Sequence, residues 1–61
     1  MATTINIEEF DLHGRYWTRI GIHSEDYVLV TNYSPDEVAE MGIWPLLQQT
    51  LAEFIEDGGW L

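Results

Sequence analysis

The residues with the clearest chemical meaning are the carboxylates near the end of the chain. The last ten residues read AEFIEDGGWL, and Glu53, Glu56 and Asp57 stand there without a base among them. Backbone carbonyls already make a helix C-terminus negative, so acids at this place oppose the helix dipole by about 0.3–1 kcal/mol each. Acids three or four residues apart on a helix also repel each other, by roughly 0.2–0.5 kcal/mol per pair. We therefore expect these three acids to lower the stability of the fold.

A second set of acids precedes them, in the segment SPDEVAEM. Asp36 and Glu40 stand four residues apart, and no basic residue follows Arg19, so the sequence offers them no partner in this half. Asp36 and Glu37 differ from the later acids because they come at the start of a helix, where negative charge is favourable.

The whole chain carries the same sign of charge. Its 61 residues include 11 acids and two bases, for a net charge of −9, and lysine is absent. A field of this sign repels nucleic acid and anionic lipid but attracts basic protein surfaces. Rows of carboxylates a few ångström apart resemble a nucleic acid duplex, which carries one charge per roughly 1.7 Å. We expect a surface made for a strongly basic partner; the alternative is that the acids only keep the chain in solution.

Catalytic or metal-binding chemistry is poorly supported. His13 and His23 are the only histidines, and the sequence places both in solvated loops. No serine stands in a nucleophile elbow, no glycine-rich phosphate loop follows a strand, and the calcium-loop pattern of alternating acids does not occur. Glu8, Glu9 and Asp11 could cluster, but adjacent strand residues point to opposite faces. We expect no enzyme activity, no cofactor and no metal site.

The location of the protein is indicated by what the chain lacks. It contains no cysteine, which suits a reducing compartment. The start MATTINIEEF has no basic region followed by an apolar stretch, so it does not resemble a signal peptide. The longest nearly apolar run, MGIWPLL, is too short to cross a bilayer. These features predict a cytoplasmic protein with no membrane contact.

The first half of the chain predicts strands. Residues 15–22 and 27–33 are rich in β-branched and aromatic types, and residues 23–26 read as a four-residue hairpin loop that pairs Ile22 with Tyr27. One face would then hold Tyr16, Thr18, Ile20, Ile22, Leu29 and Thr31, and the other would hold Trp17, Arg19, Val28 and Val30. Residues 3–10 fit a strand or a capped helix; the strand is favoured, with a turn near residues 11–14.

The second half predicts helices. Ser34, Pro35 and Glu37 form a helix start signal with a capping box, and this helix ends at Gly42. A second helix is expected from Pro45 to about Asp57, followed by Gly58 as its C′ residue. The fold class is therefore α+β, a single domain over residues 1–61, in which a small antiparallel sheet of two or three strands is followed by two helices packed on it.

The three tryptophans differ in their surroundings in the sequence. Trp17 and Trp44 are expected in the core or at its edge. Trp60 follows two glycines and either folds over the helix end or forms an exposed aromatic anchor for a partner.

The chain resembles a known group of proteins. Its length, its charge of −9, the absence of lysine and the stretch from YWTRIGIHSEDYVLVTNYSPDEVAEMGIW to FIEDGGWL are similar to the small acidic anti-CRISPR proteins of bacteriophages and mobile elements. The likeness is greatest to inhibitors of type I systems, with type I-C as the candidate group. It implies a non-enzymatic inhibitor that acts in the bacterial host cell, binds an RNA-guided surveillance complex and blocks target DNA.

Two binding functions follow from these observations. The first is a monomeric inhibitor that imitates DNA, binds a basic DNA-binding site of a surveillance complex and makes no direct contact with nucleic acid. The alternative is an immunity protein or antitoxin that neutralises a basic nuclease or toxin. The charge argument, together with the exposed-anchor reading of Trp60, gives the predicted partner-binding residues: Glu25, Asp26, Asp36, Glu37, Glu40, Glu53, Glu56, Asp57 and Trp60.

Overall fold

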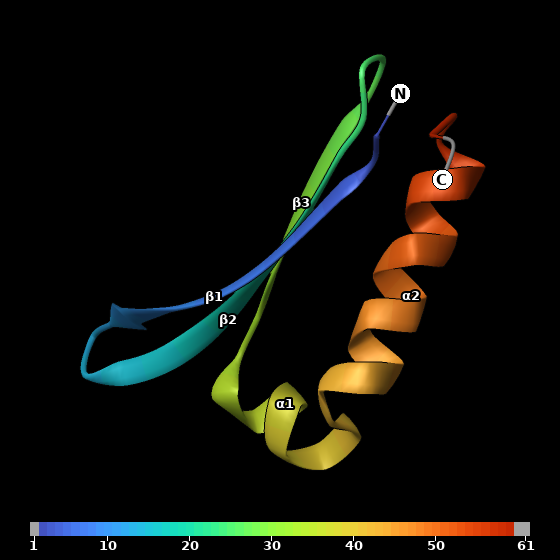
Figure 1. The fold of residues 1–61 in the computed structure, drawn as a ribbon. Coiled ribbons are helices and arrows are strands. Elements are labelled where there is room, and N and C mark those ends of the chain that lie inside the picture. The colour runs from blue at the N-terminus through green and yellow to red at the C-terminus, as the bar shows by residue number, and fades with distance from the viewer. Residues whose placement is uncertain (1, 60–61) are drawn as a thin grey trace.

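The computed structural model describes residues 2–59, which form a three-stranded antiparallel sheet with two helices packed on it (Figure 1). The elements follow in the order β1 (Thr4–Leu12), β2 (Arg15–His23), β3 (Val28–Tyr33), α1 (Pro35–Met41) and α2 (Ile43–Glu56). The strand order is β1-β2-β3, so β2 is central and the other two strands form the edges. The predicted α+β architecture is confirmed, and residues 3–10 take the favoured strand structure.

The first hairpin turns within two residues. His13 and Gly14 have φ angles of 54° and 80°, and positive φ at both central positions is the geometry of the turns that match strand twist. The Asp11 carboxylate accepts a hydrogen bond from the Gly14 N–H at 3.0 Å, which holds this turn. The turn lies in the predicted region, although β1 continues to Leu12.

The second hairpin has the predicted faces but a different register. Ile22 pairs with Leu29 and not with Tyr27, so the pairing is shifted by two residues, and the loop runs from residue 24 to residue 27. Ser24 fixes this loop, since its Oγ accepts from the Tyr27 N–H and its own N–H donates to the Tyr27 carbonyl, at 3.1 Å and 2.9 Å. His23 was predicted to lie in a loop, but it is the last residue of β2 and pairs with Val28.

The helices begin and end at clear local signals. Ser34 and Glu37 form the predicted capping box, in which each side chain accepts from the other residue's backbone N–H. Gly42, with φ of 86°, separates α1 from α2. The second helix begins at Ile43 and not at Pro45. Pro45 is tolerated in the first turn because the backbone N–H that proline lacks would have no helical partner there.

The end of α2 confirms the predicted role of Gly58. This residue has φ of 112°, and its N–H donates to the Ile55 carbonyl, while the Gly59 N–H donates to the Phe54 carbonyl at 2.8 Å. This pair of bonds is the Schellman motif. A side chain at Gly59 would collide with the Phe54 ring, so the chain passes tightly over the end of the core.

The core lies between the sheet and α2. Its buried apolar side chains come from β2, β3 and α2, and they are Ile20, Ile22, Tyr33, Leu46, Leu47 and Phe54. Trp17 was predicted to lie in the core or at its edge; it is half-buried, but it lies on the sheet face opposite the helices. Trp44 was expected in the core or at its edge, but 73% of it is exposed, because its turn of α2 directs it away from the sheet.

The helices cover β2 and β3 but leave the edge strand β1 largely open. Ile5 and Ile7 face the helix side of the sheet, since they pair with Ile22 and Ile20, yet 41% and 46% of them are exposed. Within residues 2–59, neither helix has the length and apolar character needed to cross a bilayer.

Candidate interaction surface

Five of the predicted partner-binding acids come together at one end of the molecule. Figure 1 shows the loop between β2 and β3 and the end of α2 at the same end, where the loop contributes two acids and the helix end contributes three. We call this set the C-terminal acidic group: Glu25, Asp26, Glu53, Glu56 and Asp57. Sequence reasoning selected each residue, but their meeting depends on the tertiary fold.

Tyr27 joins the two halves of the C-terminal acidic group. Its hydroxyl donates to the Asp57 carboxylate at 3.2 Å, and its ring lies 5.5 Å from the Phe54 ring, centroid to centroid. Partial burial raises the pKa of Tyr27, and the charge of Asp57 and its hydrogen bond raise that pKa further. The tyrosine therefore stays protonated and donates to the carboxylate at neutral pH.

The chain's two bases do not neutralise this group. Arg15 and Arg19 both lie on β2, and the ion pairs they form among residues 2–59 are with Asp36 and Glu8, at 2.8 Å and 3.7 Å. Four members of the C-terminal acidic group make no side-chain hydrogen bond or ion pair within the described part of the chain, namely Glu25, Asp26, Glu53 and Glu56. Their charge faces solvent uncompensated.

The three acids of α1 form a second set, which we call the α1 acidic group: Asp36, Glu37 and Glu40. The helical half offers Asp36 no base, as expected, but Arg15 of β2 donates two hydrogen bonds to it, at 2.8 Å and 3.3 Å. These bonds and the charge of Arg15 lower the pKa of Asp36 and raise the pKa of Arg15. Glu37 is occupied by the capping box, so Glu40 is the member of this group that makes no side-chain hydrogen bond or ion pair within residues 2–59.

Arg19 belongs to the sheet face that the helices leave open. Its guanidinium lies 4.4 Å from the centre of the Phe10 ring, and its Nε donates to the Asn32 side chain at 3.0 Å. The Phe10 ring and the Asn32 side chain hold this cation on the sheet, so it does not neutralise the C-terminal acidic group.

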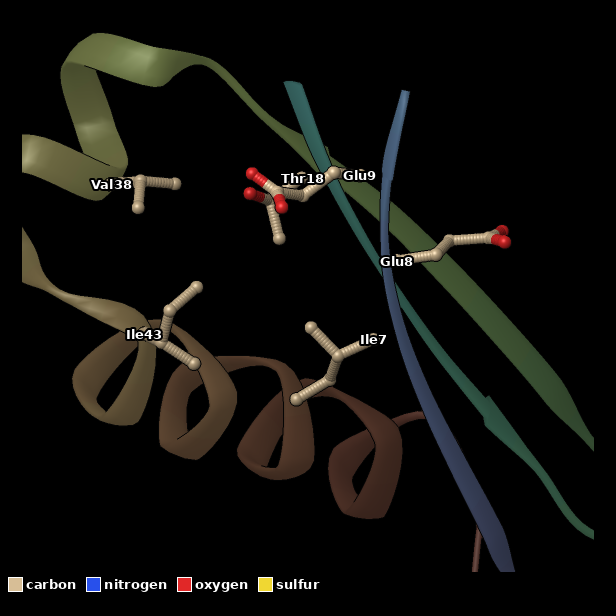
Figure 2. A pocket seen from close by; sticks show the side chains of 6 residues that line it. All are labelled: Ile7, Glu8, Glu9, Thr18, Val38 and Ile43. Carbon is tan, nitrogen blue, oxygen red and sulfur yellow. The ribbon is translucent and has the colours of Figure 1, made fainter. Parts of the chain in front are cut away.

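A shallow recess opens where β1 faces the helices. Its volume is about 360 Å³, and its lining residues are Ile7, Glu8, Glu9, Thr18, Val38 and Ile43. Figure 2 shows the Ile7 side chain directed toward α2, the Glu9 carboxylate directed toward Val38, and the Glu8 side chain directed away. The sequence analysis did not predict this recess, because its lining comes from two strands and both helices that only the tertiary fold brings together.

Metal chemistry gains no geometric support from the described residues. Among residues 2–59, no three histidine or acidic side chains come together in a way that could hold a metal ion. Trp60 lies outside the described residues, so its predicted role as an anchor stays a prediction.

The geometry of this chain has to be interpreted by itself. No protein-family model, no curated protein and no solved structure matches the chain.

Proposed function

We propose that this protein is a non-enzymatic inhibitor that imitates nucleic acid with its carboxylates. It binds the basic DNA-binding site of a bacterial CRISPR surveillance complex, of type I and with type I-C as the candidate, and so prevents the capture of target DNA. It acts as a monomer in the cytoplasm and makes no contact with DNA itself.

One observation carries the proposal: five carboxylates gather at one end with no basic side chain among them. Four of the five have no partner within residues 2–59, although acids at a helix C-terminus cost stability. A small domain has little stability to spare, so an arrangement that lowers it points to selection for binding. Solubility alone would be served by acids spread over the surface, each near a base.

The two acidic groups stand near opposite ends of α2, and residues 43–52 between them carry no acid. The α1 acidic group and the C-terminal acidic group flank α2, whose 14 residues span about 20 Å at 1.5 Å per residue. A B-DNA strand carries phosphates about 3.4 Å apart along its axis, so the two groups bracket a length of roughly six phosphates. Asp36 contributes least to this imitation, because Arg15 already neutralises it.

The deciding experiment is a competition for target DNA. A purified type I-C surveillance complex is incubated with labelled target duplex and increasing amounts of this protein, at several salt concentrations. We expect loss of DNA capture at low salt and recovery as salt rises, because the attraction between the acidic and basic surfaces is screened. A complex that captures DNA equally well with the protein in excess would eliminate the proposal.

Two double variants with equal net charge test which carboxylates matter. The variant E53Q/E56Q removes two unpaired acids, and the control E8Q/D36N removes the two acids that pair with arginine. We expect the first to weaken inhibition about tenfold, since two interface charges of roughly 0.7 kcal/mol each sum to 1.4 kcal/mol. The control should weaken it clearly less. Equal losses would mean that only net charge matters.

Capture from host extract separates the proposal from the alternative. Co-purification of a surveillance complex supports DNA mimicry, whereas co-purification of a single basic nuclease or toxin would assign the protein to the immunity or antitoxin class.

A further inference from the structure

The edge strand β1 is unusually open for a protein of this size. It is nine residues long and pairs with β2 on one side, while no other strand of residues 2–59 pairs with its second side. Hydrogen-bonding pairs alternate along an antiparallel ladder, so about half of its backbone N–H and C=O groups point to the open side. Proteins usually shorten or cover such an edge, because it is a template for another strand.

The open edge borders an apolar groove. Ile5 and Ile7 lie on the helix side of β1 but are half exposed, because α2 packs on β2 and β3. Ile7 also lines the recess with Val38 and Ile43 from the two helices (Figure 2). Side chains from an added strand would enter this groove and complete the cover over β1.

Charge defines what kind of strand fits. On its helix side β1 reads Ile5, Ile7, Glu9 and Asp11, two apolar residues followed by two acids. Figure 2 shows the Glu9 carboxylate directed into the recess, beside the apolar side chains of Ile7 and Val38. A lysine or arginine opposite Glu9 could lay its aliphatic stem on these side chains and its charged head on the carboxylate.

A second copy of this chain does not satisfy the same pattern. Full antiparallel overlap of two β1 strands would place Glu8 opposite Glu8 and Ile7 opposite Glu9. Like charges directly opposite each other destabilise a strand pair, and two chains of net charge −9 repel over their whole surface. The acids of β1 thus keep copies apart while leaving the edge open to a basic strand.

We propose that β1 is a docking edge for an extended segment of a partner protein that carries basic residues and then apolar residues at every second position, all on one face. The segment pairs antiparallel with β1, its apolar side chains lie against Ile5 and Ile7, and a basic side chain meets Glu9. This site is separate from the DNA mimicry, because it uses no carboxylate of the C-terminal acidic group.

The experiment titrates the full, isotope-labelled chain with the peptide acetyl-RTKTVTIT-amide and follows the backbone amides by NMR. Paired antiparallel with β1, this peptide places its lysine opposite Glu9, its valine opposite Ile7 and its isoleucine opposite Ile5. We expect saturable shifts along β1 and slower amide exchange at its open edge. Shifts spread over the molecule without preference for β1 would overturn the proposal.

Peptide and protein variants separate the charge contact with Glu9 from the apolar contact with Ile7. The peptide acetyl-ETETVTIT-amide, with the basic residues replaced by acids, should bind at least tenfold more weakly. The substitutions Ile7→Lys and Glu9→Lys should each lower the affinity of the protein for the basic peptide by about tenfold or more. Val30→Lys is the matched control, since Val30 is also a β-branched strand residue with 49% exposure but lies on β3 and the opposite sheet face.

The same protein variants give the outcomes that would contradict the proposal. Unchanged binding to Ile7→Lys and Glu9→Lys, or an equal loss with Val30→Lys, would exclude β1 as the docking edge. A dimer that forms at high concentration and is lost in Ile7→Lys would assign the edge to a second copy instead. Neither result bears on competition for DNA, so the two proposals fail independently.

Discussion

At the scale of single residues, the two arginines determine which acids remain available. Arg15 neutralises Asp36 with two hydrogen bonds, and Arg19 lies between Phe10, Asn32 and Glu8. Both bases are thus paired with other acids, and the charges of the acids at the end of α2 are not neutralised by a base.

The Arg15–Asp36 pair predicts a pH-dependent contribution to stability. The pKa of Asp36 is lower in the folded protein than its ordinary value of about 3.9. A lowered folded pKa means that the stabilisation is present above the unfolded pKa and is lost as the pH falls through the folded pKa. Asp36→Asn should therefore lower the Tm above about pH 5.

The Tm difference between this variant and the original chain should shrink below about pH 4 and vanish in stronger acid. Thermal unfolding followed by circular dichroism from pH 2 to pH 7 measures this difference. Arg15→Gln removes the same pair from the other side, so the double variant should behave like each single variant. A Tm difference that persists unchanged at pH 2 would show that Asp36 acts by another route.

At the scale of elements, local signals predicted the helices and strands better than they predicted how these pair. The capping box of Ser34 and the Schellman glycine Gly58 were readable because all their partners lie within a few residues. The register of β2 and β3 was not, since a shift of two residues leaves every side chain on the same face. The hydrogen bonds between Ser24 and Tyr27 select the observed register, and four-residue loop length alone does not.

The sheet and α2 are joined by one buried polar contact that predicts an asymmetric pair of mutants. Thr50 Oγ1 donates to the Leu46 carbonyl at 2.8 Å, so in its 2.6 Å contact with Tyr33 the tyrosine hydroxyl must be the donor. Thr50→Val leaves a buried Tyr33 hydroxyl without a partner, at about 1–3 kcal/mol, whereas Tyr33→Phe should cost about 0.5–1.5 kcal/mol.

Urea unfolding of both single variants and of the double variant measures these free energies. The double variant should be less destabilised than the sum of the single variants, because the tyrosine hydroxyl that was left unsatisfied is then absent. Strict additivity would show that the two side chains do not depend on each other.

The two ends of the helical segment predict opposite effects of the same substitution. Glu56 is the last residue of α2, where its charge opposes the dipole, so Glu56→Gln should raise stability by about 0.3–1 kcal/mol. Glu37 lies in the first turn of α1, so Glu37→Gln should slightly lower stability, although glutamine can still complete the capping box. Denaturation midpoints at low salt measure both, and the same sign of change for both would contradict the argument.

At the scale of the whole molecule, the candidate site was predictable as a set of residues but not as a surface. Charge and helical spacing selected Glu53, Glu56 and Asp57, whereas Glu25 and Asp26 join them through the long-range contacts of Tyr27 with Asp57 and Phe54. The groove beside β1 is also a product of assembly, because it arises where α2 covers two strands and leaves the third open. Single-segment patterns carry no information about such gaps.

The excess of negative charge predicts that salt acts in opposite directions on folding and on binding. Unpaired carboxylates repel one another in the folded state, and the Debye length falls to about 10 Å at 0.1 M salt. Raising NaCl from 20 mM to 500 mM should therefore raise the Tm. A gain of about 1 kcal/mol corresponds to about 4–8 °C for a domain of this size.

The same salt range should weaken binding to the basic partner, because screening acts between the two surfaces as it acts within one. The variant E53Q/E56Q should show a smaller rise in Tm with salt than the charge-matched control E8Q/D36N, which keeps the C-terminal acidic group intact. Differential scanning calorimetry of the three chains measures these slopes. If the Tm falls with salt, or if both variants lose the same slope, the unpaired carboxylates at the end of α2 are not the source of the repulsion, and the argument that their placement reflects binding loses its physical basis.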